Sequence, residues 1–247
     1  MCSSDLIVTL DQEKAYDKID HDYLWRILRK FGLPDEFIKR IQELYKNTSK
    51  VIMINGTVTK KYKVGRGVHQ GDPMSCILYD LAIEPLAEAL RKSNLKGLDI
   101  EGNIERLVVN LFTDDTIVYL RKDDNMEVLD MVLNTFCKVS TVKFNVNITE
   151  ILPIGKARFR KEMIEKCRMG TNIIDEDKKI IKEGESMRTL GSWVGNGKTD
   201  SPHWERIIKL QEKIIEKWSR MNLTTKGKEL ALKSLIQLKA VFLATRV

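Results

Sequence analysis

The segment Leu107-Val108-Val109-Asn110-Leu111-Phe112-Thr113-Asp114-Asp115-Thr116-Ile117-Val118-Tyr119-Leu120 places two apolar, β-branched runs on either side of a polar centre. This pattern predicts a β-hairpin whose tight turn carries two adjacent carboxylates. Two carboxylates a few ångströms apart repel each other, so one takes up a proton near neutral pH unless a cation lies between them. Mg²⁺ is the obvious cation for such oxygen ligands. Asp is also common in solvated turns, so this segment is either a metal-binding turn or an ordinary solvated hairpin turn. Other parts of the sequence are needed to distinguish these two interpretations.

The bulk composition is that of a basic, globular chain. With 247 residues, 43% of them hydrophobic, it has room for one large domain, or for one domain with a small appendage. The net charge of +7 indicates a polyanionic partner, and nucleic acid is the leading candidate. The cysteines show no C-x-x-C spacing and form no ligand set with the three histidines. We therefore expect reduced thiols and no zinc.

Targeting signals are absent from the sequence. No apolar run approaches the ~18 residues that cross a bilayer. Leu6–Leu10 is too short for a signal peptide and lacks flanking basic residues. We expect an intracellular, soluble chain, in the nucleus or cytoplasm, with no membrane partner.

A third carboxylate stands at the end of another apolar run. Leu6–Leu10 fits a buried strand and leads directly into Asp11. The nearby Asp20 is better explained as a helix N-cap, because apolar residues follow it at helical spacing until Gly32. Asp11 is thus a site candidate, with a turn or capping residue as the alternative.

Further signals outline helices and a second hairpin before residue 107. A helix begins at Pro34, and Asn55-Gly56 between two apolar runs is a strong hairpin signal. The glycine-punctuated loop Arg66-Gly67-Val68-His69-Gln70-Gly71-Asp72-Pro73 supplies an N-cap and a first residue for a helix that Pro85 should kink. Its two glycines would let a ligand approach the backbone closely, but a plain loop before a helix has the same pattern.

The region after the central hairpin is less regular. Lys143–Val146 and Glu150–Ile154 resemble strands. Residues 156–182 are charged and show little periodicity, which is typical of solvated surface. Met187–Val194 indicates a strand broken by Gly191.

Two terminal helices follow a predicted boundary of Asn, Gly, Ser and Pro residues near 197. Aromatic and apolar residues recur at helical spacing in the first of them, from Trp204 to Trp218. We interpret these positions as core rather than as platforms for stacking bases.

The three carboxylates together suggest a reaction. Phosphoryl transfer by two metal ions needs carboxylates from separate strands that converge on ions about 3.5–4 Å apart. Asp11, Asp114 and Asp115 would supply them if the two strands lie side by side. Oxygen ligands select Mg²⁺ or Mn²⁺ over zinc, so we expect two such ions.

Three motifs occur in order: Asp11-Gln12-Glu13-Lys14-Ala15-Tyr16-Asp17, then Arg66–Ser75, then Phe112-Thr113-Asp114-Asp115. Their order and spacing closely resemble the palm of reverse transcriptases from non-LTR (LINE-type) retrotransposons. The resemblance implies an α+β fold, a polymerase palm in which helices back an antiparallel sheet. The palm, without most of the fingers, would occupy residues 1–197, and a partial α-helical thumb residues 198–247.

The resemblance also implies roles for individual residues. Asp11 and Asp114 would be ligands of both metals, with Asp115 as the third carboxylate. Tyr16 takes the place of an aromatic steric gate that clashes with a ribose 2′-hydroxyl; its alternative is a core tyrosine. The pair Gln70-Gly71 matches the loop that lies against the incoming nucleotide and template.

Primer and template contacts follow from the same resemblance. Leu190-Gly191 is similar to a primer-grip turn. Lys226 and Lys228 would lie along the duplex backbone, where contacts are independent of sequence and sensitive to salt. The implied partners are an RNA template, a DNA primer and deoxynucleoside triphosphates.

Some positions depart from the family pattern. Thr113 replaces the usual small residue before the Asp pair, and His69 replaces the usual Arg. Ile148 stands where a lysine is common. The chain begins at the first palm strand, so we expect it to lack the fingers and to extend a primer poorly.

Three functions compete at this point. The leading one is an RNA-directed DNA polymerase domain, a fragment of a retrotransposon polyprotein that adds deoxynucleotides to a primer 3′ end. The second is a catalytically inactive remnant that binds nucleic acid. A metal-dependent nuclease would explain the carboxylates but not the Gln70-Gly71 loop. The sequence does not indicate an oligomeric state.

Overall fold

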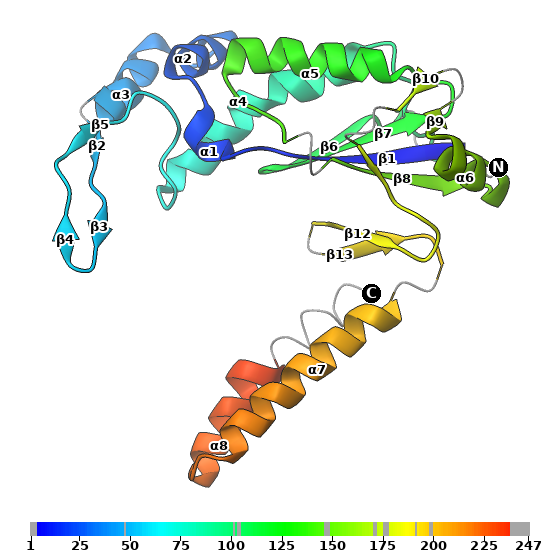
Figure 1. The fold of residues 1–247 in the computed structure, drawn as a ribbon. Coiled ribbons are helices and arrows are strands. Elements are labelled where there is room, and N and C mark those ends of the chain that lie inside the picture. The colour runs from blue at the N-terminus through cyan, green and yellow to red at the C-terminus, as the bar shows by residue number, and fades with distance from the viewer. Residues whose placement is uncertain are drawn as a thin grey trace. The chain divides into compact units, whose positions relative to one another are not determined.

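The computed structural model describes residues 4–46, 48–100, 102, 105–145, 149–169, 172–174, 178–190, 192–197 and 200–237. The chain is mixed α/β and forms two compact units, Met1–Ile180 and Ile181–Val247, which we call the sheet unit and the C-terminal unit (Figure 1). Among the described residues, no helix is both long enough and apolar enough to cross a membrane.

The sheet unit alternates strands with helices. Its helices are α1 (Ala15–Lys18), α2 (His21–Lys30), α3 (Asp35–Lys46), α4 (Pro73–Lys92), α5 (Met126–Ser140) and α6 (Ala157–Lys166). Its main strands are β1 (Ser4–Asp11), β6 (Val109–Phe112), β7 (Asp115–Arg121), β8 (Glu150–Gly155) and β11 (Lys179–Ile180). Shorter strands form two-stranded ribbons: β2 (Ser49–Lys50) with β5 (Tyr62–Lys63), β3 (Met53–Ile54) with β4 (Thr57–Val58), and β9 (Arg168–Met169) with β10 (Asn172–Ile173).

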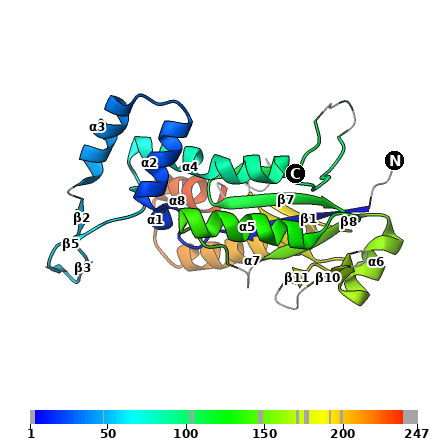
Figure 2. The same cartoon turned by 90° about the horizontal axis from the view of Figure 1, so that it is seen from above.

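The main sheet has the strand order β11-β8-β1-β7-β6. Neighbouring strands are antiparallel, except that β11 runs parallel to β8. Figures 1 and 2 show α4 and α5 on one face of this sheet, with α2 beside these two helices. The predicted antiparallel sheet backed by helices is therefore confirmed, with one parallel edge strand added.

Alternation along β1 explains why the helices cover one face. Leu6, Val8 and Leu10 are at most 5% exposed and join the core formed with the helices, whereas Ile7 and Thr9 between them are only half-buried. Successive side chains on a strand point to opposite faces. Asp11 continues the odd-numbered series, so it belongs to the face away from the helix layer.

Several local predictions are confirmed. The Asp20 carboxylate accepts a hydrogen bond from the Tyr23 amide (2.8 Å) and caps α2. Asn55 and Gly56 both have positive φ, as a two-residue hairpin turn of this type requires. The loop before α4 ends as expected, because the Asp72 carboxylate caps that helix through the Met74 amide (3.0 Å).

Other predictions need correction. The predicted strand Lys143–Val146 is not found in its described part, residues 143–145, where Phe144 forms a single bridge with Gln12; Val146–Ile148 lie outside the described residues. Residues 156–182 are more than solvated surface, because they include α6 and β11. The periodicity of α6 is weak because it buries little beyond Met163.

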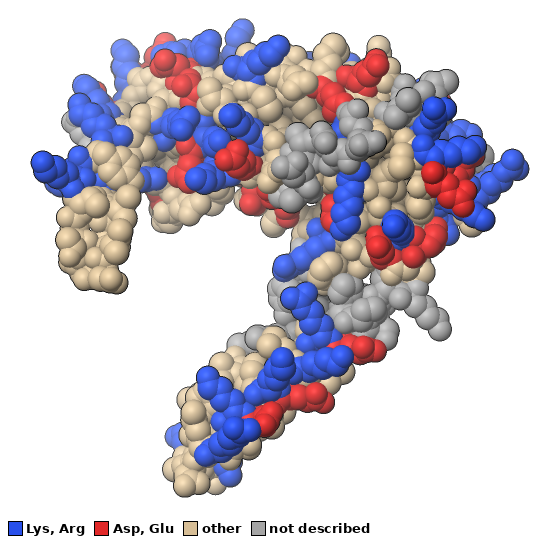
Figure 3. Space-filling view, in the orientation of Figure 1, with Lys and Arg blue, Asp and Glu red and all other residues tan. Residues whose placement is uncertain are grey.

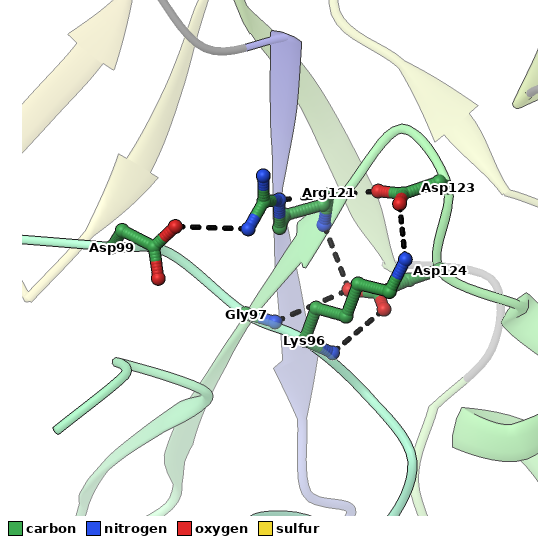
Figure 4. A network of polar contacts seen from close by, with 6 residues as sticks. All are labelled: Lys96, Gly97, Asp99, Arg121, Asp123 and Asp124. Atoms are coloured by element: carbon green, nitrogen blue, oxygen red, sulfur yellow. Dashed lines mark hydrogen bonds and ion pairs between the residues drawn. The ribbon is translucent and has the colours of Figure 1, made fainter. Parts of the chain in front are cut away.

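A polar network closes the end of the sheet unit that is remote from Asp11 (Figure 4). The buried Asp124 carboxylate accepts backbone hydrogen bonds from Lys96 (2.7 Å), Gly97 (3.2 Å) and Arg121 (2.8 Å). Arg121 in turn pairs with Asp99 (2.8 Å). These bonds attach the segment that follows α4 to the end of β7.

The C-terminal unit contains a hairpin and helices. Its elements are β12 (Ser186–Thr189), β13 (Ser192–Gly195), α7 (Asp200–Ser219), α8 (Thr225–Ala231) and a π-helical turn (Leu232–Gln237). The predicted strand Met187–Val194 is thus an antiparallel hairpin. The two predicted helices are present. The functional boundary between residues 197 and 198 stays a prediction, since the compact units divide at 180 and 181.

Candidate active site

Two carboxylates face each other across neighbouring strands. In the register of β1 and β7, Asp11 lies directly opposite Asp115, and Phe112 lies opposite Asp115 on the other side. Directly opposed residues of an antiparallel pair share a face of the sheet. Asp114 lies in the turn between β6 and β7, and Asp115 is the first residue of β7 rather than part of the turn. All three carboxylates therefore lie at one end of the sheet.

The electrostatics of this end favour a cation. The pKa of Asp11 is raised, first by partial burial and then by the negative charges of Asp114 and Asp115. Like charges directly opposed across strands are destabilising. A divalent cation among the carboxylates would reverse that effect.

The donor set fits Mg²⁺ or Mn²⁺ in chemistry, although it is not a closed cage. Among the described residues, no three His, Cys, Asp or Glu side chains are already grouped in a way that could hold a metal ion. Mg²⁺ usually keeps several waters and takes one or two carboxylates together with substrate phosphates. An open set of three carboxylates fits that mode of binding.

The turn that carries Asp114 is strained. Thr113 has φ = 51°, in the left-handed region that β-branched residues rarely adopt. Its hydroxyl donates to the Phe112 carbonyl (2.7 Å). Backbone strain of this kind concentrates at functional sites.

A buried polar network supports the two strands from behind. Gln12 follows Asp11 and Thr116 follows Asp115, and both side chains are nearly fully buried. The Gln12 amide donates to the Thr116 hydroxyl (3.2 Å), while the Tyr79 hydroxyl of α4 donates to the Gln12 carbonyl oxygen (2.5 Å). Each strand thus presents a carboxylate on one face and is held to its neighbour on the other.

Tyr16 lies beside this network and not in the centre of the core. Its ring stacks on Tyr79, with centroids 4.7 Å apart and planes 14° from parallel. Its hydroxyl contacts the Cys76 sulfur at 3.6 Å. The pKa of Tyr16 is raised to about 12, chiefly by burial, then by Cys76, with a smaller contribution from the negative charge of Asp114. Of the three carboxylates, Asp114 thus acts electrostatically on the half-buried Tyr16.

The loop before α4 is bound to the segment that carries Tyr16. The Gly67 amide donates to the Ile19 carbonyl and the Val68 amide donates to the Tyr16 carbonyl, each at 2.7 Å. Gly67 has φ = +83°, and a Cβ built there would lie 2.7 Å from the Tyr16 carbonyl oxygen. Only glycine fits this approach. Gln70 and Gly71, further along the loop, are exposed.

His69, which departs from the family pattern, is part of an aromatic cluster. Its ring stacks on Tyr45 of α3, with centroids 5.2 Å apart and planes 8° from parallel. Tyr45 also contacts His21 and Trp25 of α2 edge-on. His21 Nε2 donates to the Gly67 carbonyl (2.8 Å). Stacking on α3 fixes the loop at the residue directly before Gln70.

The remaining predicted contacts lie in the C-terminal unit. Leu190 occupies the β12–β13 turn with φ = 48°, a strained conformation for a bulky residue. Gly191 lies outside the described residues. Lys226 and Lys228 are exposed on α8.

A basic surface on α7 was not predicted from the sequence. Exposed cations line one face of α7 and make no ion pair with any described residue. They are Arg206, Lys209, Lys213 and Lys217. Their spacing of three and four residues was the available signal, but the aromatic and apolar stripe of the same helix masked it.

The residues whose hydrogen bonds hold β1, β7 and α4 together were also not predicted from the sequence. They are Gln12, Tyr79 and Thr116. Gln12 and Thr116 directly follow predicted site residues, and this position was their only signal. Tyr79 lies in a helix and needs the fold to bring it to the strands.

Comparison with known proteins identifies the family of this chain. Residues 2–191 match the family described as reverse transcriptase (RNA-dependent DNA polymerase). The chain is 33% identical over 138 residues to the Transposon TX1 uncharacterized 149 kDa protein of Xenopus laevis, covering 56% of this chain and 10% of that protein.

Two further relatives are retrovirus-related Pol polyproteins. One, from the type-2 retrotransposable element R2DM of Drosophila melanogaster, is 28% identical over 144 residues, which are 57% of this chain and 13% of that protein. The other, from the type-1 retrotransposable element R2 of Popillia japonica, is 35% identical over 88 residues, which are 34% and 14%. The chain spans about a tenth of the length of these relatives. The matched segment contains Asp11, the Gln70-Gly71 loop and the Asp114-Asp115 pair on a helix-backed sheet, and the chain belongs to the reverse transcriptase family.

Proposed function

We propose that this chain carries the nucleotidyl-transfer site of an RNA-directed DNA polymerase from a retrotransposon. One observation supports the proposal above the others: Asp11 lies directly opposite Asp115 and next to the strained turn of Asp114, in a chain of the reverse transcriptase family. The reaction joins the primer 3′-oxygen to the α-phosphorus of a deoxynucleoside triphosphate and releases pyrophosphate.

Asp11, Asp114 and Asp115 would hold two divalent ions, Mg²⁺ or Mn²⁺. When bound, these ions would activate the attacking hydroxyl and neutralise charge on the leaving phosphates. The protein's own contribution is position. The buried bonds among Gln12, Thr116 and Tyr79 hold the two carboxylate-bearing strands in register, so little reorganisation is needed when the ions bind.

Tyr16 would select the sugar of the incoming nucleotide. The ring is fixed by its stack on Tyr79 and by the loop amide that binds its own carbonyl. A fixed ring can reject a 2′-hydroxyl by collision, which a mobile ring cannot. Gln70 and Gly71, in the exposed part of that loop, would contact the nucleotide and the template.

The C-terminal unit would hold the primer–template duplex. Leu190 and Gly191 would contact the primer, with Lys226 and Lys228 on the backbone. The cationic face of α7 extends the same surface chemistry over Arg206, Lys209 and Lys213. Phosphate contacts of this kind supply affinity without reading sequence.

The test is extension of a labelled DNA primer on an RNA template with deoxynucleotides and Mg²⁺ or Mn²⁺. We expect the chain to extend the primer weakly but measurably, and the double variant Asp114→Asn, Asp115→Asn to fall to the level of a sample without protein. Met131→Ser on α5 is a suitable control, because Met131 is exposed and remote in sequence from all three motifs.

Two other outcomes are informative. Metal-dependent loss of template without extension would identify a nuclease. Retained duplex binding with no extension by either protein would identify a nucleic-acid-binding remnant, the alternative that the sequence left open. Both would contradict the proposal.

A further inference from the structure

The segment Ser49–Lys63, which we call the β-arm, forms a ribbon of two strands. Its root is the pairing of β2 with β5, and its tip is the pairing of β3 with β4 around Asn55-Gly56. All thirteen residues from Val51 to Lys63 are exposed. Figure 1 shows the β-arm extending away from the helices of the sheet unit. A two-stranded ribbon without a covering layer is only marginally stable in water.

The tip of the β-arm is apolar. Met53 is 70% exposed, Ile54 64% and Ile52 50%. Met53 lies opposite Val58 on one face of the ribbon, and Ile54 lies opposite Thr57 on the other. Apolar side chains therefore project from both faces. Contiguous exposed apolar groups mark interaction sites when polar residues rim them.

The rim of this tip is cationic. Residues 44–71 contain six Lys or Arg and no Asp or Glu. Lys50 pairs with Asp17 of α1 (3.3 Å), whereas Lys60, Lys61 and Lys63 make no ion pair with any described residue. In Figure 3 the blue basic side chains gather at the root of the β-arm, and the tip carries no charge.

We propose that the β-arm binds a nucleic-acid duplex, with its apolar tip in a groove and its lysines on the flanking phosphates. A groove has apolar sugar and base edges between two rows of phosphates, which matches an apolar tip on a cationic root. The major groove of B-form DNA admits a two-stranded ribbon, and the wide, shallow minor groove of an A-form-like duplex is open to the tip of one. Apolar side chains are the groups that enter between bases or against sugars. A second copy of the chain is a poorer partner, because two cationic roots repel.

The β-arm is also continuous with the proposed active site. Its root leads directly into the loop that carries Gln70 and Gly71, and the Val64 amide closes the root on the Thr48 carbonyl (3.1 Å). The inference rests on the proposed function in one respect: the duplex that this chain would meet is the primer–template hybrid. The β-arm would hold that hybrid at a point separate from the three carboxylates.

The experiment measures binding without catalysis. Fluorescence anisotropy is recorded for a labelled RNA–DNA hybrid, a DNA duplex of the same sequence and the two single strands, with EDTA and no nucleotide. The affinity for each of these nucleic acids is measured for three proteins. They are the full chain, a tip variant (Met53→Ser, Ile54→Ser) and a root variant (Lys60→Gln, Lys61→Gln, Lys63→Gln). Met131→Ser is the control for an exposed apolar residue elsewhere in the sheet unit, and the pair Lys92→Gln, Lys138→Gln, in which Lys92 is paired with Glu88, is the control for the loss of positive charge away from the β-arm.

We expect the tip variant to bind the hybrid about tenfold more weakly. The root variant should reduce the slope of log affinity against log salt by about 2–3, since each phosphate that a lysine no longer neutralises lowers the slope by about one. Single strands, which have no groove, should respond to the root variant but not to the tip variant. Circular dichroism should show unchanged folding, since these side chains lie outside the core.

Three results would overturn the proposal. One is unchanged affinity and salt slope in both arm variants, and another is the absence of duplex binding by the wild-type chain. The third is self-association, measured by sedimentation, that the tip variant abolishes while duplex binding stays constant. Failure of the proposed function has a different signature, because the double variant Asp114→Asn, Asp115→Asn would then behave as wild type in primer extension while binding still depended on the β-arm.

Discussion

At the level of single residues, the ionised carboxylate of Asp11 is less favourable in the folded protein than in the unfolded chain. Its pKa is raised by burial and by two neighbouring carboxylates, so the folded protein binds more protons than the unfolded chain at pH values between 3.8 and the folded-state pKa. The free energy of unfolding therefore falls as pH rises through that window, and the loss persists at neutral pH.

Asp11→Asn should accordingly stabilise the metal-free protein. We expect the free energy of unfolding at pH 7 to rise by no more than ~1 kcal/mol, because Asp114 is exposed and Asp11 and Asp115 are only partly buried, so that solvent screens the repulsion among the three carboxylates. Urea unfolding in EDTA measures this. Added Mn²⁺ should stabilise the wild type by mass action but not the variant. A variant less stable than the wild type in EDTA would show that Asp11 is not repelled.

Tyr16 offers a second test at this scale, because its ring and its hydroxyl have separate contacts. The ring stacks on Tyr79, whereas the hydroxyl contacts the Cys76 sulfur. Tyr16→Ala should increase ribonucleotide incorporation relative to deoxynucleotide incorporation, by up to about 10²-fold, the scale on which a pocket discriminates against an added hydroxyl. Tyr16→Phe keeps the ring and should leave the ratio unchanged. Equal ratios in all three proteins would remove Tyr16 from sugar selection.

At the level of elements, the contact between the α4 loop and the Tyr16 segment depends on one glycine. Gly67 and Gly32 both have φ near +80°, but a Cβ at Gly67 would meet backbone atoms within 3 Å, whereas a Cβ at Gly32 would meet nothing within 4 Å. Gly32→Ala should cost about 1–2 kcal/mol from the left-handed backbone alone. Gly67→Ala should cost about 1–3 kcal/mol in addition, from overpacking.

The comparison is made by urea unfolding, with equal m values as a check that the two variants unfold alike. Gly67→Ala should also impair nucleotide selection, because the displaced backbone includes the carbonyl of Tyr16. Equal destabilisation by the two substitutions would mean that the loop adapts and that the close approach is not important.

Local chemistry explains which elements the sequence predicts. The β6–β7 hairpin, the Asn55-Gly56 turn and the caps at Asp20 and Asp72 depend on neighbouring residues, and all four are correct. One prediction that was not confirmed, the strand at Lys143–Val146, depended on a partner: the described part of this segment forms one bridge, between Phe144 and Gln12 at the end of β1.

In the candidate site too, features that depend on neighbouring residues were predicted, whereas contacts between distant residues were not. Asp11 was predicted from its position at the end of a strand, and the Asp114-Asp115 pair from its position at a hairpin turn. The bonds that join Gln12, Thr116 and Tyr79 span more than sixty residues of sequence. No periodicity encodes such contacts, and only the antiparallel register of β1 and β7 and the position of α4 create them.

At the level of the whole molecule, the net charge is +7, and the exposed cations differ in whether an acidic residue pairs with them. Many exposed cations are neutralised locally, such as Lys92 by Glu88 and Arg220 by Glu216. The cationic face of α7 is not neutralised in this way by any described residue. Because only uncompensated cations displace counterions from a duplex, α7 should contribute more to binding than its share of the charge.

We therefore expect Arg206→Gln, Lys209→Gln and Lys213→Gln together to weaken hybrid binding uniformly across sequences and to reduce the salt slope by about 2–3. The control carries Lys92→Gln and Lys138→Gln on the helices behind the sheet and should bind nearly as the wild type does. Titrations of a labelled hybrid between 50 and 200 mM salt, a range over which phosphate contacts change affinity by about 10³-fold or more, separate the two. A loss of affinity that is equal in both variants would mean that net charge alone attracts the duplex. A loss confined to the α7 variant, with an unchanged circular dichroism spectrum, would assign the contact to one helix face, because the two variants differ by only one unit of charge.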